Sequence, residues 1–173
     1  MTPDSRKNLI IWIVIVLVCF NLLAWNLVFK GSLPRSLKVV FFDIGQGSAV
    51  LIETSQHTQI LVDGGPSSKI VEKLGRTLPF FDRSIDLIIS THPDFDHLAG
   101  LVEVLKSYRV EAVGSTGVKG QTAEFEEFMA ETNREGAEKI ILKKGEIIRV
   151  GQNLKIEVLA PLEDFTCREV KDY

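Results

Sequence analysis

The segment His92–His97 holds two histidines and two aspartates, at positions 92, 94, 96 and 97. Imidazole nitrogens and carboxylate oxygens are the ligands that suit Zn²⁺, Mn²⁺ or Fe at a hydrolytic centre. A polar loop with solvated side chains is the alternative, but the chain has only three histidines. Two of them beside two aspartates favour a metal site, and we take His92, Asp94, Asp96 and His97 as its candidate ligands.

An apolar, strand-like run, Ile85–Ile89, leads into these residues. A strand ends at the rim of a sheet, so the side chains that follow it converge on one point instead of spreading around a helix. Pro93 biases His92 towards an extended conformation, which discourages the strand from continuing directly into a helix. Apolar residues then predict a helix that begins immediately after His97 and presents its N-terminus to the site. These residues, at helical spacing, are Leu98, Leu101, Val102, Leu105 and Tyr108.

Three β-rich runs come earlier in the chain, separated by short turns, and predict an antiparallel meander. They cover residues 39–42, 49–53 and 59–62. Apolar stripes predict helices over residues 67–78 and 123–135. The remaining expected strands cover residues 110–113, 139–142, 146–150 and 154–159. Strands that alternate with helices after an antiparallel start imply an α/β layered domain.

Polar, glycine-rich segments follow the first and third of these strands. They are Asp43–Gly47, which includes Gln46, and Asp63–Gly65, which includes Gly64. The first segment lacks the Lys-Ser/Thr pair of a phosphate loop, so Gly45 and Gly47 are better explained as a tight structural turn. Asp63 could be a simple turn former, but its place at a strand end in this context favours a functional role.

Other reactive side chains fit structural or solvated positions better. His57 lies in a polar hairpin turn, where we expect it to be solvated. Cys19 falls inside an apolar span and Cys167 in a polar tail, so an intrachain disulfide is not expected. A Ser-His-Asp triad that uses Ser48 or Ser90 stays open, although no nucleophile-elbow sequence supports it.

Residues 9–29 are almost entirely apolar and carry no charge. A helix of about 20 residues spans the hydrocarbon core of a bilayer, and Trp12 and Trp25 lie near the two ends, where aromatic rings favour the interface. A cleaved signal peptide has a shorter apolar core, about 7 to 15 residues, followed by a small-x-small site. The long core without a convincing site favours an uncleaved anchor.

Positive charge flanks both ends of this span, so the positive-inside rule does not decide its orientation. The short tail, residues 1–8, resembles that of a signal anchor. We therefore expect a single-pass protein of the cell membrane with its domain outside the cytoplasm. The linker is expected at residues 30–36, and residues 37–173 are enough for one domain.

The expected domain is acidic. The first 36 residues hold four of the 20 basic residues and one of the 23 acidic residues, which leaves a formal net charge of −6 for the domain. It lacks the broad positive field of a strong nucleic-acid binder. A nuclease is still compatible with this charge, because bound metal ions supply local positive charge.

The pattern His92-x-Asp94-x-Asp96-His97, after Asp63 and its two glycines, resembles the metallo-β-lactamase-fold hydrolases, whose usual signature is His-x-His-x-Asp-His. The aspartate at position 94, together with Phe42–Gly47, is similar to the ComEC-like branch. That branch comprises the hydrolase domain of DNA-uptake competence channels and small membrane-anchored relatives. The resemblance covers residues 37–159 and implies the αββα fold, of which this chain supplies the first half.

The resemblance also implies roles for single residues. His92 and Asp94 would bind a first metal ion, and Asp96 and His97 a second. Asp96 is in addition the candidate catalytic residue. Asp63 would support the ligands from behind, and Gly64 and Gly65 would allow a tight turn beneath the metal ions. Asp43 and Gln46 would lie in the neighbouring motif loop.

Two divalent ions about 3.5 to 4 Å apart can clamp a phosphate or carbonyl oxygen and activate water without a serine or cysteine nucleophile. We expect Zn²⁺ or Mn²⁺ as the cofactor pair, since a carboxylate in place of the second histidine shifts the preference somewhat towards Mn²⁺. The expected function is a membrane-anchored, dinuclear metal-dependent hydrolase of phosphodiesters. DNA is the expected substrate and a competence channel the expected partner.

The chain departs from this family after position 97. Further ligands usually come from later histidines and a bridging aspartate, whereas no histidine follows His97, and the only later aspartates are Asp164 and Asp172 in a polar tail. We expect that the chain is truncated. A protein that has lost catalysis and serves as a binding module is one alternative. A hydrolase of small esters, thioesters or lactams is another, because a fold does not fix a substrate.

Overall fold

The computed structural model describes residues 3–31, 36–150 and 154–160. The chain divides into two compact units, residues 1–33 and 34–173. The expected polar tail at residues 161–173, with Asp164, Cys167 and Asp172, lies outside the described residues.

The first unit is one long helix, α1 (Pro3–Gly31). Its segment Arg6–Asn26 is long and apolar enough to cross a membrane and has no buried residues. A helix that is apolar on all sides is suited to a lipid environment. The helix extends to Gly31, so Lys30 and Gly31, which we had expected in the linker, belong to it.

The second unit contains a six-stranded sheet with the strand order β1-β2-β3-β4-β5-β6. Strands β1, β2 and β3 pair antiparallel, and β3 to β6 pair parallel. This confirms the antiparallel start and the α/β architecture. The bounds are β1 (Lys38–Phe41), β2 (Val50–Glu53), β3 (Gln59–Val62), β4 (Ser84–Ser90), β5 (Arg109–Ser115) and β6 (Glu138–Ile141).

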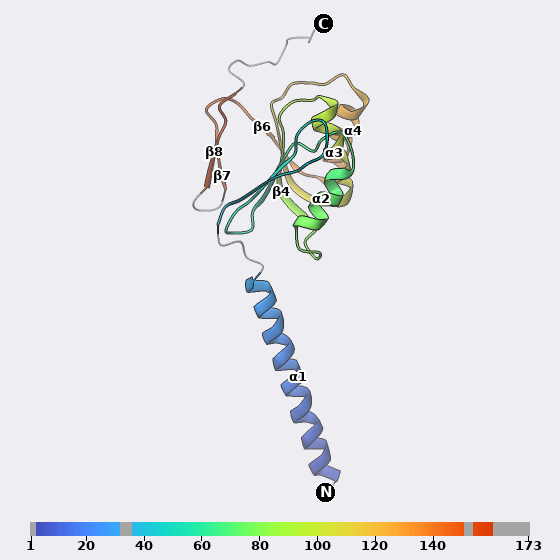
Figure 1. Ribbon diagram of the computed structural model, residues 1–173, viewed down its shortest axis with the longest axis vertical. Helices are drawn as coiled ribbons and strands as arrows, with labels where there is room; N and C mark the ends of the chain where they lie inside the picture. The colour runs from blue at the N-terminus through green and yellow to red at the C-terminus, as the bar shows by residue number, and fades with distance from the viewer. Residues whose placement is uncertain (1–2, 32–35, 151–153, 161–173) are drawn as a thin grey trace. The chain divides into compact units, whose positions relative to one another are not determined.

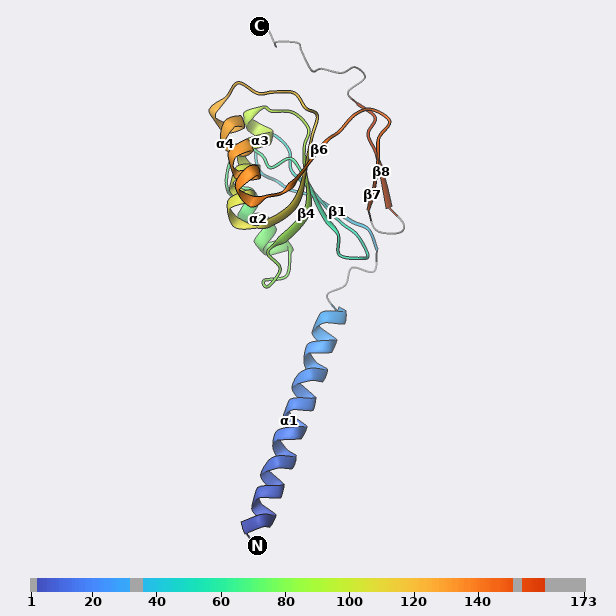
Figure 2. The same cartoon turned by 180° about the vertical axis from the view of Figure 1, so that it is seen from behind.

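Three helices cover one face of this sheet, as Figures 1 and 2 show. They are α2 (Lys69–Thr77), α3 (Phe95–Ser107) and α4 (Ala123–Glu135). Their apolar side chains and those of the strands form one buried cluster, which includes Leu51, Leu61, Ile88, Leu98 and Leu101. Because each fully buried Leu or Ile contributes about 1.5 to 3 kcal/mol, this layer is the main source of stability.

A hairpin of β7 (Ile147–Val150) and β8 (Leu154–Glu157) covers part of the opposite face. Its side chains pack with Ile60, Leu87 and Ile89 in a second, smaller cluster. Val39 and Phe41 are exposed on β1, at 45% and 79%. They alternate with Val40, which packs on the helix side. Apolar surface of the edge strand is therefore left uncovered by the described residues.

Helix α3 begins earlier than the sequence pattern indicated. We expected its start immediately after His97, but it begins at Phe95 with Asp94 as the N-cap residue. Asp94 is extended, with φ −76° and ψ 147°, and its side chain forms no capping hydrogen bond. Its backbone has the non-helical conformation that N-cap residues adopt. Asp96 and His97 consequently lie in the first turn of the helix, where a carboxylate is stabilised by the helix dipole.

Candidate metal centre

The ends of three strands bring the polar segments together at one edge of the sheet. Phe41, at the end of β1, pairs with Val50, which pairs with Val62 at the end of β3, and Val62 pairs with Ile89 of β4. The segments that follow β1, β3 and β4 therefore emerge side by side. They are residues 42–48, 63–65 and 91–97.

Backbone contacts fix helix α3 against the turn after β3. The Gly64 amide donates to the His97 carbonyl at 2.8 Å, and the Gly100 amide donates to the Gly65 carbonyl at 2.7 Å. A Cβ atom on Gly100 would lie 1.9 Å from the Gly64 carbonyl oxygen. Only a glycine at position 100 allows the helix to approach this closely, and the approach positions His97.

The segment after β1 also touches α3 through its backbone. Gly47 has a φ of +82°, and a Cβ atom on it would lie 1.8 Å from the Asp96 carbonyl oxygen. A side chain at position 47 would therefore displace either the segment or the helix. This contact places Ser48 beside the site.

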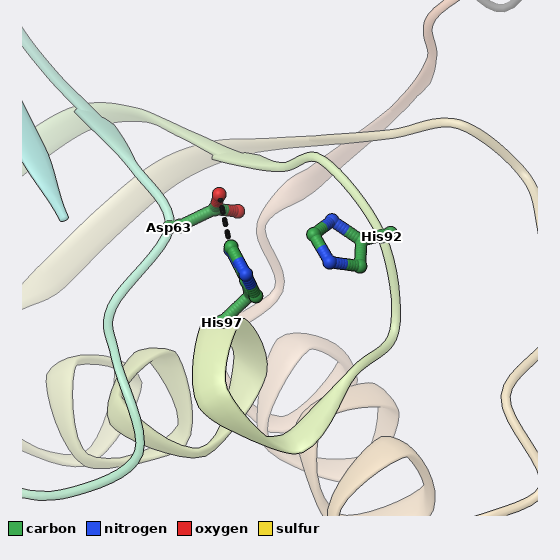
Figure 3. A group of neighbouring side chains, drawn as sticks. All are labelled: Asp63, His92 and His97. Carbon is green, nitrogen blue, oxygen red and sulfur yellow. Dashed lines mark hydrogen bonds and ion pairs between the residues drawn. The ribbon is translucent and has the colours of Figure 1, made fainter. Parts of the chain in front are cut away.

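The Asp63 carboxylate is the centre of the hydrogen-bond network. Its side chain is 3% exposed, and its Oδ1 accepts the Thr91 amide at 2.9 Å. Its Oδ2 lies within hydrogen-bond distance of Ser48 Oγ (3.1 Å), Thr91 Oγ1 (2.8 Å) and His97 Nδ1 (2.9 Å). One of these contacts reaches Oδ1 and three converge on Oδ2, so Asp63 is engaged through both of its oxygens. Figure 3 shows Asp63, His92 and His97 pointing towards one another.

These contacts determine the proton positions on both histidines. An ionised carboxylate only accepts, so His97 Nδ1 carries the proton that faces Asp63. The Thr91 hydroxyl donates its single proton to Asp63 and therefore accepts from His92 Nδ1, which lies 2.8 Å away. In the neutral form of each ring, Nε2 then keeps its lone pair, which is the form in which histidine binds a metal ion.

Each free Nε2 atom lies near a carboxylate. His92 Nε2 is 3.5 Å from Asp94 Oδ2, and His97 Nε2 is 3.9 Å from Asp96 Oδ1. The two imidazole rings are adjacent, with their centroids 3.9 Å apart. The site therefore contains two pairs, each with one imidazole and one carboxylate, whose rings are adjacent.

The charge of this group suits a divalent cation. Within the described ranges, Asp63, Asp94 and Asp96 form ion pairs only with histidines, and no Lys or Arg neutralises them. Asp63, His92 and His97 also have ligand atoms within 4.8 Å of one another. The Asp63 side chain is 3% exposed and already engaged by its neighbours, so the more accessible donors for a metal ion are the two Nε2 atoms and the carboxylates of Asp94 and Asp96.

The structure does not bring every candidate residue into this group. Asp43 and Gln46 are exposed, and neither side chain forms a hydrogen bond or ion pair with the described residues. His57 lies at the other end of the sheet, in the turn between β2 and β3, where its Nδ1 is 3.9 Å from Glu53 Oε1.

Two residues of the network were not identified as supporting residues from the sequence. Thr91 follows β4 directly and precedes His92, and this position at a strand end was the only available signal. The sequence suggested Ser48 only as a possible nucleophile. Its hydroxyl instead lies 3.1 Å from both Asp63 Oδ2 and His97 Nδ1, where it helps to hold the ring.

A family model described as the metallo-beta-lactamase superfamily matches residues 42–164. Solved structures with a similar chain path include the Rm3 metallo-beta-lactamase, with 19% identity, a TM-score of 0.48, and coverage of 70% of this chain and 48% of that one. The metallo-beta-lactamase SMB-1 in a complex with mercaptoacetic acid has 22% identity and a TM-score of 0.47, with coverage of 75% of this chain and 54% of that one. MEM-A1, a subclass B3 metallo-beta-lactamase isolated from a soil metagenome library, has 20% identity and a TM-score of 0.45, with coverage of 69% of this chain and 50% of that one.

The chain spans about half the length of these solved proteins. A search of curated proteins gave no match.

Proposed function

The chain belongs to the metallo-beta-lactamase superfamily, and from this premise we propose that it carries the first half of a dinuclear, metal-dependent hydrolase anchored in a membrane. The observation that carries the proposal is the pair of imidazole–carboxylate groups whose Nε2 atoms are both free. Most members of this superfamily are hydrolases. The rest of the metal shell would come from outside the described residues.

In this proposal His92 and Asp94 hold one metal ion, and Asp96 and His97 hold the other. Divalent ions bound there, Zn²⁺ or Mn²⁺, would supply Lewis acidity and lower the pKa of water towards neutrality. Asp63 orients His97 directly and His92 through the Thr91 hydroxyl. Such supporting contacts keep the ligand rings in a fixed direction and raise their basicity.

Asp96 is the proposed catalytic residue. Its carboxylate forms no hydrogen bond with the described residues, and its side chain is 31% exposed at the first turn of α3. It can accept a hydrogen bond from an attacking water molecule and so direct the water at a substrate. The neighbouring His97 is held by Asp63 and Ser48 and is not free to turn towards this water.

The proposed substrate is a phosphodiester, with DNA outside the cytoplasm as the leading example. Support comes from Asp94 and the segment Phe42–Gly47, which resemble the ComEC-like branch, and from α1, which is long and apolar enough to cross a membrane. A competence channel is the proposed partner. The acidic domain would rely on its metal ions, not on a basic surface, to attract a phosphate group.

The test uses the complete product of the reading frame that encodes this chain, purified in detergent with Mn²⁺ or Zn²⁺. Hydrolysis of bis-p-nitrophenyl phosphate should fall at least about 100-fold in His92→Ala and Asp96→Asn, a range typical for the loss of a catalytic group. His57→Ala is the matched control, because His57 lies at the other end of the sheet. Unchanged hydrolysis in folded, metal-loaded Asp96→Asn would refute the assignment.

A substrate panel separates the enzyme alternatives. If ester, thioester or lactam probes are hydrolysed and the phosphodiester is not, the metal centre stands but the proposed substrate is wrong.

A non-catalytic binding module is the second candidate function. It is favoured by the small number of imidazoles in the site, since only His92 and His97 lie there among the described residues. This candidate predicts a complete, stably folded product that retains no metal after dialysis. Metal analysis by mass spectrometry decides between the two, because a dinuclear hydrolase should retain close to two metal ions per chain.

A further inference from the structure

Two adjacent phenylalanines project from the connection between α2 and β4. Phe80 is 82% exposed and Phe81 is 43% exposed. Their rings meet edge to face, with centroids 5.2 Å apart and an interplanar angle of 83°. Single exposed apolar residues are common on protein surfaces, but a paired aromatic tip on one short loop is a feature that a contact with another surface would explain.

The loop is held in place by its neighbours, so the rings are presented from a fixed base. The Asp82 amide donates to the Pro79 carbonyl at 2.9 Å. The Asp82 carboxylate accepts from Gln59 Nε2 at 2.6 Å and from Ser84 Oγ at 2.8 Å. A loop that is already ordered loses little conformational entropy when it binds.

This loop lies at the end of the sheet where the chain enters the domain. Gln59, which binds Asp82, pairs with Glu53, and Glu53 pairs with Lys38, the first residue of β1. Neighbouring strands are about 4.8 Å apart, so Lys38 and Gln59 are separated by about 10 Å. Figures 1 and 2 show the α2–β4 connection at the same end of the domain as the β2–β3 turn.

The chain that leads to β1 is short. Six residues separate Gly31, the last residue of α1, from Lys38, and this stretch reaches at most about 25 Å when fully extended. A bilayer that holds α1 is therefore within reach of this end of the domain. The opposite end carries the candidate metal centre.

Basic residues accompany the aromatic pair. Arg83 is the last residue of the loop, and its carbonyl accepts the amide of Arg109, the first residue of β5. Both arginines are exposed, and the Arg83 guanidinium lies 5.4 Å from the centroid of the Tyr108 ring. Aromatic rings beside basic side chains suit the headgroup region of a bilayer that contains anionic lipid.

We propose that the loop Pro79–Arg83 is a membrane-docking loop, whose Phe80 and Phe81 rings enter the interface of the bilayer that holds α1. The proposal rests on the insertion of α1 and not on hydrolase activity. Docking of the loop would fix the distance of the metal centre from the lipid. Strand β4 starts beside the loop and ends at the metal centre, and its seven residues span about 20 Å. A docked domain holds its site away from the lipid, where a polymer in solution can reach it.

The test measures the distance of each end of the domain from the lipid, in the full chain reconstituted into vesicles of phosphatidylcholine and phosphatidylglycerol. Cys19 and Cys167 are replaced by Ala and Ser, and one new cysteine carries a fluorescent dye. Ser55→Cys, in the exposed β2–β3 turn, reports on the proposed docking end. Lys119→Cys reports on the metal end. Its neighbour Gly120 lies close to Pro93 of the metal-site segment, since a Cβ on Gly120 would be 3.0 Å from Pro93 Cβ. Lipids with a nitroxide headgroup quench dyes that lie at the surface.

The proposal predicts at least threefold stronger quenching at position 55 than at position 119. In the Phe80→Ser/Phe81→Ser background this difference should disappear, while the thermal unfolding midpoint in detergent stays within about 2 °C. Phe80→Ser alone replaces the double variant if the latter does not fold. The measurement needs no metal, so it is independent of the proposed hydrolase.

Equal quenching at the two positions, or a difference that survives the loss of both rings, would overturn the proposal. A quenching pattern that changes with the number of chains per vesicle would assign the rings to a contact between two copies instead, and would equally overturn it.

Discussion

The two ends of the six-stranded sheet are built on different principles. At the end where β3 and β4 terminate, polar side chains converge on the buried Asp63, and backbone segments touch at Gly47 and Gly100. At the opposite end the contacts are made by a short loop around Asp82, and apolar rings are exposed. The first end depends on a buried carboxylate and on backbone contacts that leave no room for a side chain, so it should be sensitive to substitution. At the second end the two rings are exposed, so their substitution should be tolerated.

The largest expected effect is a difference in the free energy of unfolding between alanine variants of two helical glycines. Gly100 touches the backbone at the site end, and Gly75 lies away from it. Gly100→Ala should destabilise the domain by about 3 kcal/mol, because its Cβ would meet the Gly64 backbone. Gly75→Ala, on an exposed face of α2, should stabilise it by about 0.5 to 1 kcal/mol through helix propensity. Its Cβ would meet only the Tyr108 hydroxyl, at 3.9 Å. Chemical denaturation of both variants in detergent is the measurement. If the two variants have the same free energy of unfolding, the close approach does not position α3.

Asp63→Asn tests the polar network. The amide keeps an acceptor for the Thr91 amide but places a donor where three other donors point at Oδ2. Metal affinity should fall about 10- to 100-fold, as for other residues that support metal ligands. Titration calorimetry with Mn²⁺ and Zn²⁺ measures it. Asp43→Asn is the control, since Asp43 is exposed, and an equal loss in both variants would contradict the central position of Asp63.

Thr91→Val separates the hydroxyl from the backbone contact. The Thr91 amide still reaches Asp63, but His92 Nδ1 loses its acceptor. Metal affinity should fall about tenfold, while Thr91→Ser should retain it. In nitrogen NMR spectra the His92 ring should populate both neutral tautomers in the valine variant. A single unchanged tautomer would show that Thr91 does not orient this ring.

The smallest expected effect lies at the opposite end, at Asp86. Burial raises the pKa of this carboxyl above 3.8, the charges of Glu111 and Asp82 add to the rise, and the bond from the Gln59 amide opposes it. A raised pKa means that the folded state disfavours the ionised form, so stability falls as the pH rises through the folded pKa. The Asp86→Asn variant has no carboxyl to ionise at this position, so its stability should not fall in this way. The free energy of unfolding of the variant, minus that of the wild type, should therefore rise slightly from acid to neutral pH, as measured by urea unfolding. A trend in the other direction would contradict the role of burial.

The sequence was a good guide to the order and type of the elements. Alternating apolar residues and short turns located β1 to β8, and helical spacing located α2, α3 and α4. It failed at the start of α3, because Pro93 and Asp94 allow a helix to begin at Phe95, and periodicity alone does not locate an N-cap. It also left open whether Asp43 and Gln46 reach the site, since a residue in a loop has no register that fixes its direction.

The sequence by itself determined which chemistry is available: two histidines and three aspartates, all in segments that follow a predicted strand. It also determined the long apolar helix, because hydrophobicity over that length is a property of composition. Only the tertiary structure decided that Asp63 contacts both Thr91 and His97, which lie 28 and 34 positions further along the chain. Such contacts depend on strand register and on the close approach of Gly64 and Gly100, and these follow from the packing of the whole sheet against α3.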